Sequence, residues 1–293
     1  MTVLEVIQRS TAFLSKKEVD SPRLQAELLL AHVLRLPRMQ LYLNFERALT
    51  GTELDSYREL IARRGKREPL QLLIGSTSFC GLEIEVNGHT LIPRPETELL
   101  AEQGWTFLNR TPAAADPPPT VLDFGTGTGC LAVTLAVRCP SVQVWALDCS
   151  AEALAVASRN AARHGVSERI HFVQGNALSA LGSEAPFTLI ISNPPYIPSG
   201  ELPTLQPEVR DFEPHQALDG GADGLDFYHR LAAEAGARLK PSGKIMVEFG
   251  DGQSEPLREL FASQKWIVEE ILEDYTQRSR ILVARKVNRI DNG

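Results

Sequence analysis

Hydrophobic positions recur with two different periods along the chain. Over the first 72 residues they return every three to four positions, which is the spacing of amphipathic helices. One helix is expected over residues 3–14, and a second should begin at Asp20-Ser21-Pro22, where a capping side chain precedes a proline. The apolar stripe predicted for that second helix comprises Leu24, Leu28, Ala31 and Leu34.

A third helix should follow Thr50-Gly51-Thr52-Glu53, which has the form of a capping box. Its apolar face is expected to comprise Leu54, Tyr57 and Ile61. Basic residues gather near its end: Arg63, Arg64, Lys66 and Arg67. They either complement the helix dipole in solvent or form a patch that docks a protein.

The period changes to two between residues 77 and 92, as in a half-buried strand. Apolar positions alternate there with polar neighbours: Phe79, Leu82, Ile84 and Val86. The pair Asn87-Gly88 is a strong signal for a tight hairpin turn. We therefore expect a β-hairpin over residues 73–92, joining the helical domain, residues 1–72, to the remainder, residues 93–293.

From residue 120 onward, apolar strands alternate with helices. The strands are expected at residues 121–124, 142–147, 170–174, 187–192, 244–249, 266–272 and 280–286. Alternation of this kind indicates an α/β fold with a mostly parallel sheet and helices on both faces. The last two strands follow each other without a clear helix, which favours an antiparallel pair at the sheet edge.

Composition limits the possible functions. The 293 residues are 43% hydrophobic and 23% charged, with no apolar run long enough for a membrane helix, so a cytoplasmic protein without a membrane partner is expected. The net charge of −7 is uneven: residues 1–75 carry +3 and the rest −10. An acidic second part disfavours stable binding to nucleic acid, which depends on phosphate contacts.

Neither cysteines nor histidines form a metal-binding pattern. Cys80, Cys130, Cys139 and Cys149 make no C-x-x-C pair, and we interpret them as buried or partly buried thiols. The sequence also lacks the H-E-x-x-H, G-x-S-x-G and P-loop motifs, so zinc proteases, α/β-hydrolases and P-loop enzymes lose support.

The first motif with a chemical meaning is a glycine-rich turn between a strand and a helix, Gly125-Thr126-Gly127-Thr128-Gly129. Three alternating glycines permit a sharp turn and the close approach of a ligand. In open α/β sheets this turn is where nucleotide-like ligands bind. The spacing differs from the G-x-G-x-x-G of dinucleotide enzymes and favours an adenosyl-amino-acid ligand.

A carboxylate stands at the end of the next strand. Asp148 can accept hydrogen bonds from both ribose hydroxyls of a bound nucleoside. Its alternative role is to cap the helix that starts near residue 151. Ser150 is the better cap, which leaves Asp148 available to the ligand.

The most specific motif is Asn193-Pro194-Pro195-Tyr196, directly after a buried strand. The prolines stop the strand and stiffen the turn. The Asn193 side-chain oxygen and the Pro194 carbonyl can accept the two hydrogens of an –NH₂ group, while Tyr196 stacks on its plane. Such a pocket suits the nitrogen of an amide or an adenine, and it works by positioning and electrostatics.

Together these motifs resemble those of the class I S-adenosylmethionine-dependent amino-group methyltransferases. The segment Ile92-Pro93-Arg94-Pro95-Glu96-Thr97-Glu98 is similar to one typical of the HemK-type release factor glutamine methyltransferases. Residues 210–218 resemble that family's region after its Asn-Pro-Pro-Tyr motif. The resemblance extends over essentially the whole chain, including the helical domain.

This resemblance implies a seven-stranded Rossmann-like sheet and S-adenosyl-L-methionine as cofactor. Residues 125–129 would line the cofactor, Asp148 would hold its ribose, and Thr97 would close over its methionine end. Residues 193–196 would hold the glutamine of a Gly-Gly-Gln motif in a class I peptide chain release factor, whose side-chain nitrogen N5 is methylated. The helical domain would bind this partner, and the enzyme would be a monomer.

Two adjacent positions depart from the family pattern. The family has an acidic residue and then a bulky aromatic near the adenine, where this chain has Asn176 and Ala177. Asn176 can still hydrogen-bond the adenine edge, but the aromatic contact must come from elsewhere or be missing.

Several alternatives share parts of this pattern. A ribosomal-protein glutamine methyltransferase has the same scaffold but a different segment in place of residues 92–98. An adenine N6-methyltransferase would need a basic region for extracting a base, and none is found in the sequence. The intact Asn-Pro-Pro-Tyr motif speaks against a non-catalytic binding module, and the glycine spacing speaks against a nicotinamide dehydrogenase.

Overall fold

The computed structural model describes residues 1–110, 117–182 and 186–287. They form two compact units, of which one comprises residues 1–76 and 205–212 and the other residues 77–204 and 213–293. Among the described residues, no helix is both long and apolar enough to cross a membrane.

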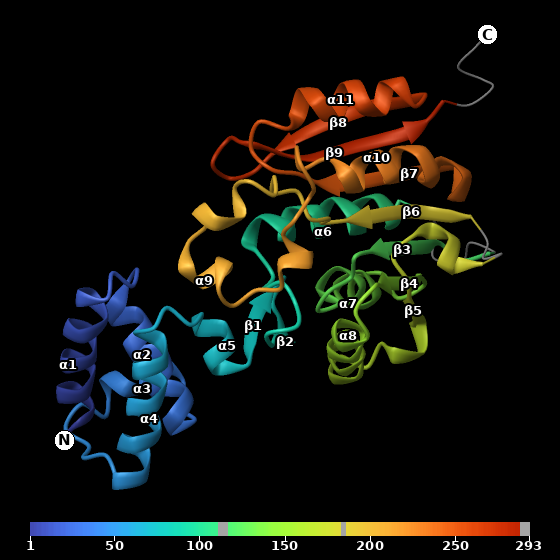
Figure 1. The fold of residues 1–293 in the computed structure, drawn as a ribbon. Coiled ribbons are helices and arrows are strands. Elements are labelled where there is room, and N and C mark those ends of the chain that lie inside the picture. Colours follow the sequence, from blue (N-terminus) through green and yellow to red (C-terminus); the bar gives the residue numbers. More distant parts are fainter. Residues whose placement is uncertain (111–116, 183–185, 288–293) are drawn as a thin grey trace. The chain divides into compact units, whose positions relative to one another are not determined.

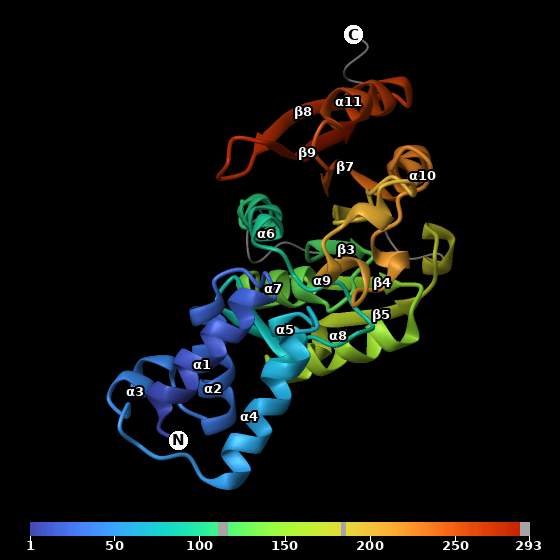
Figure 2. The same cartoon turned by 60° about the vertical axis from the view of Figure 1, so that its left-hand side comes forward.

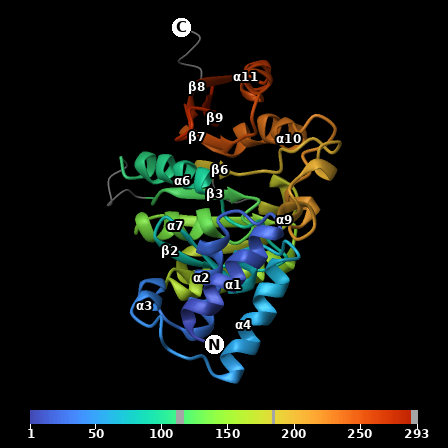
Figure 3. The ribbon, with the colours of Figure 1, turned by 90° about the vertical axis from the view of Figure 1, so that its left-hand side faces the viewer.

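The first unit is a bundle of short helices. Its elements are α1 (Val3–Lys16), α2 (Pro22–Leu34), α3 (Arg38–Tyr42), α4 (Gly51–Arg64), α5 (Leu70–Ile74) and, from later in the chain, α9 (Pro207–Arg210). Figures 1 and 3 show α1, α2 and α4 packed side by side. The predicted capping box is present: Thr50 accepts from the amide of Glu53, whose carboxylate accepts from the amide of Thr50.

Two sequence predictions for this unit hold only in part. The buried face of α2 comprises Ala26, Glu27, Leu29, Leu30 and Ala31, whereas Leu24 of the predicted stripe is 40% exposed. Of the four basic residues near the end of α4, three are ion-paired within this unit, and Lys66 is exposed. Arg64 and Arg67 both bind the carboxylate of Glu208 on α9, at 2.8 and 2.6 Å.

The second unit is a seven-stranded sheet covered by helices. Its strands are β3 (Thr120–Phe124), β4 (Gln143–Asp148), β5 (Ile170–Gln174), β6 (Phe187–Ser192), β7 (Leu239–Glu248), β8 (Trp266–Glu273) and β9 (Ser279–Lys286). Their order is β5-β4-β3-β6-β7-β9-β8, with only β9 antiparallel to its neighbours. The expected class I methyltransferase sheet, with its antiparallel pair at one edge, is confirmed.

Helices cover both faces of this sheet (Figure 2). They are α6 (Pro95–Leu108), α7 (Cys130–Arg138), α8 (Ala151–Arg163), α10 (Asp226–Glu234) and α11 (Ser254–Ser263). Helices α6, α7 and α8 pack on one apolar cluster of the sheet, and α10 and α11 pack on the other. Parallel strands end at the same edge, so the loops after β3, β4, β5 and β6 meet there.

The expected hairpin exists, but its turn lies elsewhere. Strands β1 (Ser76–Phe79) and β2 (Leu82–Glu85) are joined by Cys80 and Gly81, both in the left-handed region with φ of 50° and 78°. Asn87-Gly88 forms a separate turn after β2, in which the Thr90 amide donates to the Asn87 carbonyl. The hairpin packs on α8, because the Asn160 side chain bonds the main chain of Glu85 on both sides.

Candidate active site at the carboxyl ends of the strands

The glycine-rich turn follows β3 and opens α7. Gly125, Gly127 and Gly129 have φ of 74°, 53° and 76°, which side chains adopt only with strain. A Cβ on Gly125 or Gly127 would meet nothing within 4 Å, so these two residues face open space. A Cβ on Gly129 would lie 2.9 Å from that of Ala157 on α8, so this glycine is needed for helix packing.

Asp123, near the end of β3, stabilises this turn through two hydrogen bonds. Its Oδ2 accepts from the Thr126 hydroxyl at 2.6 Å and from the Ala132 amide at 3.1 Å. Burial raises the pKa of this carboxyl to about 7, although the Thr126 and Ala132 hydrogen bonds oppose the shift. Its Oδ1 is buried without a hydrogen-bond partner in the part of the chain that the structure describes.

Asp148 ends β4 and joins two loops of the site. One carboxylate oxygen accepts from the Gly127 amide and the other from the Ser150 amide, both at 2.9 Å. Ser150 caps α8 by accepting from the Ala153 amide, as the sequence predicts. Each carboxylate oxygen of Asp148 keeps a second lone pair, which can accept from a ligand in the cavity.

Asn193 follows β6, and one end of its side-chain amide is fixed by a hydrogen bond. Its Nδ2 donates to the Oγ1 of Thr97 at 3.0 Å, and Thr97 is itself buried in the first turn of α6. This hydrogen bond uses the amide nitrogen, and Oδ1 has no hydrogen-bond partner among the residues that the structure describes. Both residues line the cavity described below.

Only part of the Asn-Pro-Pro-Tyr motif lines the cavity. Pro195 lines the same cavity, whereas Pro194 is buried, and neither Pro194 nor Tyr196 is among the described residues that line it. The Tyr196 carbonyl accepts from the Gln253 side chain at 3.0 Å, and a Cβ on Gly250 would lie 3.0 Å from the tyrosine ring. Burial raises the pKa of Tyr196 to about 12, so its hydroxyl stays protonated.

Two further segments line the cavity and are hydrogen-bonded to each other. Arg94 donates to Glu213 at 2.5 Å, and the Ile92 amide donates to the other oxygen of this buried carboxylate at 3.2 Å. Burial raises the pKa of Glu213, while Arg94 opposes the shift. This pair joins residues 92–98 to Glu213, which lies within residues 210–218, the other segment that the sequence singles out for its family resemblance.

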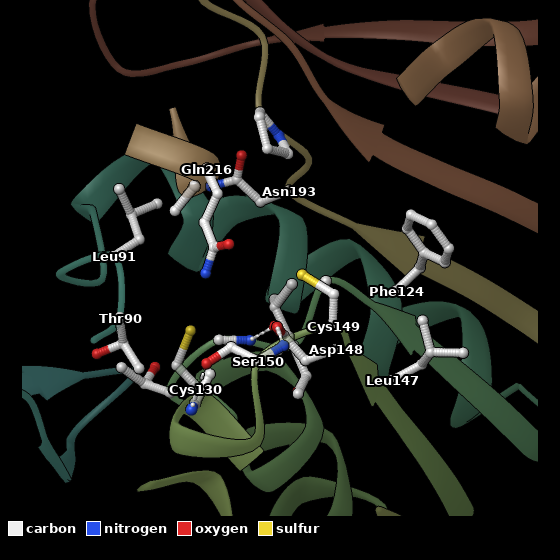
Figure 4. A pocket seen from close by; sticks show the side chains of 18 of the residues that line it. Thr90, Leu91, Phe124, Cys130, Leu147, Asp148, Cys149, Ser150, Asn193 and Gln216 are labelled. Carbon is white, nitrogen blue, oxygen red and sulfur yellow. Dashed lines mark hydrogen bonds between the residues drawn. The ribbon is translucent and has the colours of Figure 1, made fainter. Parts of the chain in front are cut away.

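These loops enclose one cavity at the end of the sheet (Figure 4). It brings together most of the predicted site residues: Thr97, Gly125, Thr126, Gly127, Thr128, Asp148, Asn176, Asn193 and Pro195. Gly129, Pro194 and Tyr196 are not among its described lining residues. Asp148 and Ser150 reach it from the β4 side, and Asn193 and Gln216 reach it from the opposite side.

The cavity also contains residues that sequence reasoning missed. Phe227 and Arg230, one turn apart on α10, line it near Asn176. The Arg230 guanidinium lies 5.6 Å from the centre of the Phe227 ring and donates to the Asn176 carbonyl. Gln216 lies within residues 210–218, so the family resemblance of that segment is a signal for it; Phe227 and Arg230 carry no comparable local signal.

Cys149 also differs from its expected environment. It is exposed at the cavity wall, beside Asp148, although the sequence suggests buried or partly buried thiols. Although the residue is exposed, partial burial of its thiol and the neighbouring Asp148 raise the pKa of Cys149, so the thiol is not activated as a nucleophile.

Comparison with known proteins identifies the family. The family model "PrmC N-terminal domain" matches residues 5–75, and "Methyltransferase small domain" matches residues 105–204. A release factor glutamine methyltransferase of Geobacter sulfurreducens is 46% identical, covering 89% of this chain and 88% of its own. One of Chlorobaculum tepidum is 44% identical, covering 95% of each chain.

A solved structure shows the same fold in a distant protein. The N-terminal domain of human METTL16 in complex with SAH is 17% identical, covers 71% of this chain and 77% of its own, and has a TM-score of 0.50. With this sheet order and with relatives that similar over nearly its full length, the chain belongs to the release factor glutamine methyltransferases, a family of S-adenosylmethionine-dependent enzymes.

Proposed function

We propose that this protein methylates the side-chain nitrogen N5 of the glutamine in the Gly-Gly-Gln motif of class I peptide chain release factors. Family membership supports the substrate class. The observation that carries the chemistry is Asn193, whose Nδ2 is engaged by Thr97 so that Oδ1 is left to accept from an –NH₂ group. The nitrogen of an acceptor amide is planar and weakly basic. Its methylation therefore depends more on the position in which the amide is held than on a base.

The cavity fits S-adenosylmethionine as the methyl donor. Open space over Gly125 and Gly127 accommodates a ligand against the main chain, and the two carboxylate oxygens of Asp148 suit the two hydroxyls of a ribose. When bound, this cofactor would supply its sulfonium-linked methyl group to the amide nitrogen and leave as the neutral thioether S-adenosylhomocysteine, and the displaced amide proton would pass to solvent. Thr97 and Asn193, at the other end of the cavity, orient the acceptor.

The adenine is proposed to lie between Asn176 and α10. Asn176 follows β5, which adjoins β4 and therefore the ribose-binding Asp148. Phe227 provides the aromatic surface that Ala177 does not, and Arg230 holds this wall together by bonding Asn176 and covering the phenyl ring. The missing aromatic at position 177 is thus replaced from another element.

Replacement of Phe227 by alanine is expected to weaken binding of S-adenosylhomocysteine about tenfold, because stacking and buried apolar area are lost. Isothermal titration calorimetry measures this directly. Phe227→Leu keeps apolar volume without the aromatic face, so its affinity for S-adenosylhomocysteine should lie between those of wild type and Phe227→Ala. Equal affinity of all three proteins would place the adenine elsewhere.

The motif residues around Asn193 are proposed to complete the acceptor pocket. Pro194 would accept the second amide hydrogen through its carbonyl, and Tyr196 would pack against the amide plane. The high pKa of Tyr196 fits a neutral packing surface and not a general base. Since Tyr196 packs on Gly250, this role requires that the substrate approach its other face.

The reaction is tested by mass spectrometry. The protein is incubated with methyl-labelled S-adenosylmethionine and a class I release factor, beside the same factor with the Gly-Gly-Gln glutamine replaced by alanine. One labelled methyl on that glutamine, absent from the variant, is the expected result. Label on a ribosomal protein or on adenine in nucleic acid, with none on the factor, would refute the proposal in favour of those substrates.

The helical unit is proposed to bind the release factor; the predicted boundary at residue 72 falls inside α5, whereas the unit extends to residue 76 and also includes residues 205–212. Two large apolar side chains are exposed on and just after α3: Met39 is 70% exposed and Leu43 is 85% exposed. They are four residues apart and so lie on one face of the helix. Adjacent exposed apolar side chains are typical of protein-binding surfaces.

Changing both Met39 and Leu43 to glutamate should raise KM for the release factor about tenfold, because charges would have to be buried on docking. Turnover of a short peptide that carries the Gly-Gly-Gln motif should not change. Tyr275→Glu in the turn between β8 and β9, where the side chain is 82% exposed, serves as the matched control. An unchanged KM for the double variant would remove this face from the docking site.

The remaining properties are also proposals. We infer that the protein acts as a monomer in the cytoplasm, where release factors are found, and that it does not bind nucleic acid stably. The −10 charge of residues 76–293 supports the last point, since phosphate backbones bind basic surfaces.

A further inference from the structure

The chain returns to the helical unit long after it has left it. Residues 205–212, which carry α9, belong to that unit, whereas the residues before and after them belong to the second unit. This segment separates two parts of the candidate site, the Asn-Pro-Pro-Tyr motif that ends at Tyr196 and the cavity wall at Gln216. Connections in compact domains are usually short, and a long excursion from a site usually has a function.

Hydrogen bonds close the excursion at its base. The Ile197 amide donates to the Leu218 carbonyl at 3.0 Å, and the Gly220 amide donates to the Ile197 carbonyl at 2.8 Å. Gly220 also packs on the motif, since a Cβ there would lie 2.8 Å from the Cα of Tyr196. Residues 197–219 thus form a strap that begins and ends against the Asn-Pro-Pro-Tyr motif.

The returning half of the strap has an attachment of its own. Glu213 accepts from the Arg94 side chain and from the Ile92 amide, and both donors belong to the second unit. Together with the closed base, this ion pair holds the cavity wall at Gln216 within the second unit. The tip of the strap, α9, is therefore not required to form the cavity.

The carboxylate of Glu208 fastens α9 to the helical unit. It accepts from the Arg64 Nη2 at 2.8 Å and, through both oxygens, from the Arg67 Nε and Nη2 at 2.6 and 2.7 Å. The bidentate pair with Arg67 is the strong form of an arginine–carboxylate interaction. Burial opposes ionisation, but the hydrogen bonds from Arg67 and Arg64 lower the pKa of Glu208 overall.

The partners of Glu208 are part of the helical unit's interior. The Arg64 side chain is nearly buried, its Nε donates to Gln25 on α2, and its Nη1 has no hydrogen-bond partner in the described part of the chain. Arg67 also donates to the Glu18 carbonyl at 3.0 Å. A buried guanidinium without a counter-charge is unfavourable, so Arg64 favours the state in which Glu208 is bound.

We propose that Glu208 is a positioning residue, which fastens the strap to Arg64 and Arg67 and so restricts the movement of the helical unit with respect to the acceptor motif. This inference rests on the proposed function, because the helical unit is proposed to bind the release factor. The connection at residues 76–77 alone allows the unit more freedom than two connections do. A factor docked on a restricted unit presents its glutamine to the cavity at a higher effective concentration.

The test compares wild type with Glu208→Gln. Glutamine keeps the size of the side chain but places an –NH₂ group against two guanidinium groups, so the bidentate pair is lost. For intact release factor, kcat/KM should fall about tenfold. Turnover of a short peptide with the Gly-Gly-Gln motif, and affinity for S-adenosylhomocysteine, should stay within about twofold, because the base of the strap remains closed. A parallel loss with factor and peptide would overturn the proposal.

Two further variants serve as controls. Glu201→Gln makes the same chemical change in the same strap, at an exposed side chain that has no hydrogen bond or ion pair with the described residues, and should behave as wild type. Arg67→Met removes the bidentate half of the contact but leaves Arg64 its counter-charge. It should lower kcat/KM for the factor about threefold, without the buried unpaired charge that could destabilise Glu208→Gln.

Hydrogen exchange read by mass spectrometry supplies a measurement without turnover. The amides of Val209, Arg210 and Asp211 are hydrogen-bonded within α9, and in Glu208→Gln they should exchange at least about tenfold faster. The amides of Ile197 and Gly220 at the base should keep their wild-type rates, and so should those of α2, which reports that the helical unit remains folded.

The outcomes of the two measurements separate this inference from the proposed function. Equal protection of α9 in wild type and Glu208→Gln would overturn the fastening role, whatever the substrate is. Faster exchange of α9 with an unchanged kcat/KM for the factor would overturn the coupling. Faster exchange in the variant, with no methylation of release factor by wild type, would instead refute the proposed function alone.

Discussion

Asn193→Ala should lower kcat by about two orders of magnitude or more while affinity for the cofactor changes less than twofold. The side chain is fixed through Nδ2 to the buried Thr97, so its Oδ1 is held in place before the substrate arrives. Loss of one preorganised polar group of this kind typically costs 10²–10³ in turnover. The cofactor is expected to be held by Asp148 and the glycine turn, which the substitution does not touch.

Single-turnover kinetics with release factor and calorimetry with S-adenosylhomocysteine measure the two quantities separately. Asn109→Ala is a matched control, because Asn109 is an exposed asparagine at the end of α6 and does not line the cavity. A variant at position 193 that turns over at the wild-type rate would defeat the proposed mechanism. A large loss of cofactor affinity would reassign Asn193 to the cofactor.

Local rules explain what the sequence could predict. The glycine turn, the Thr50 capping box and the Ser150 cap each depend on residues within a few positions of one another, and all three are present. The parallel sheet follows from the alternation of strands and helices, and its strand order agrees with the family resemblance.

The misplaced hairpin turn shows where local rules fail. Asn87-Gly88 is the better turn sequence, yet the chain turns at Cys80-Gly81, with Cys80 at an unfavourable positive φ. Contacts distant in sequence stabilise this choice: the Cys80 amide donates to Glu98, and its carbonyl accepts from Arg138. Such tertiary hydrogen bonds outweigh the preference of the turn residues and have no signature in the local pattern.

Long-range pairing also explains the errors in the helical unit and the missed site residues. The partner of Arg64 and Arg67 is Glu208, more than 140 positions away, so their chemistry could not be inferred from the end of a helix. Phe227 is brought to the cavity by α10.

Asp148→Ala is expected to weaken binding of S-adenosylhomocysteine by at least about a hundredfold. Each hydrogen bond from a ribose hydroxyl to a carboxylate contributes about 1.5–3 kcal/mol, and two are proposed. The same carboxylate also accepts from the Gly127 and Ser150 amides, so its removal loosens the glycine turn. Loss of affinity alone therefore does not separate contact with the ligand from support of the loop.

A cycle in which both protein and ligand are changed separates the two effects. S-adenosylhomocysteine and its 2′-deoxyribose analogue are titrated into wild type and Asp148→Ala by calorimetry. If Asp148 binds the ribose, the missing hydroxyl should weaken binding at least tenfold in wild type and almost not at all in the variant. If the analogue loses the same affinity in both proteins, Asp148 acts only by holding Gly127 and Ser150, and unchanged binding in the variant would remove it from the site altogether.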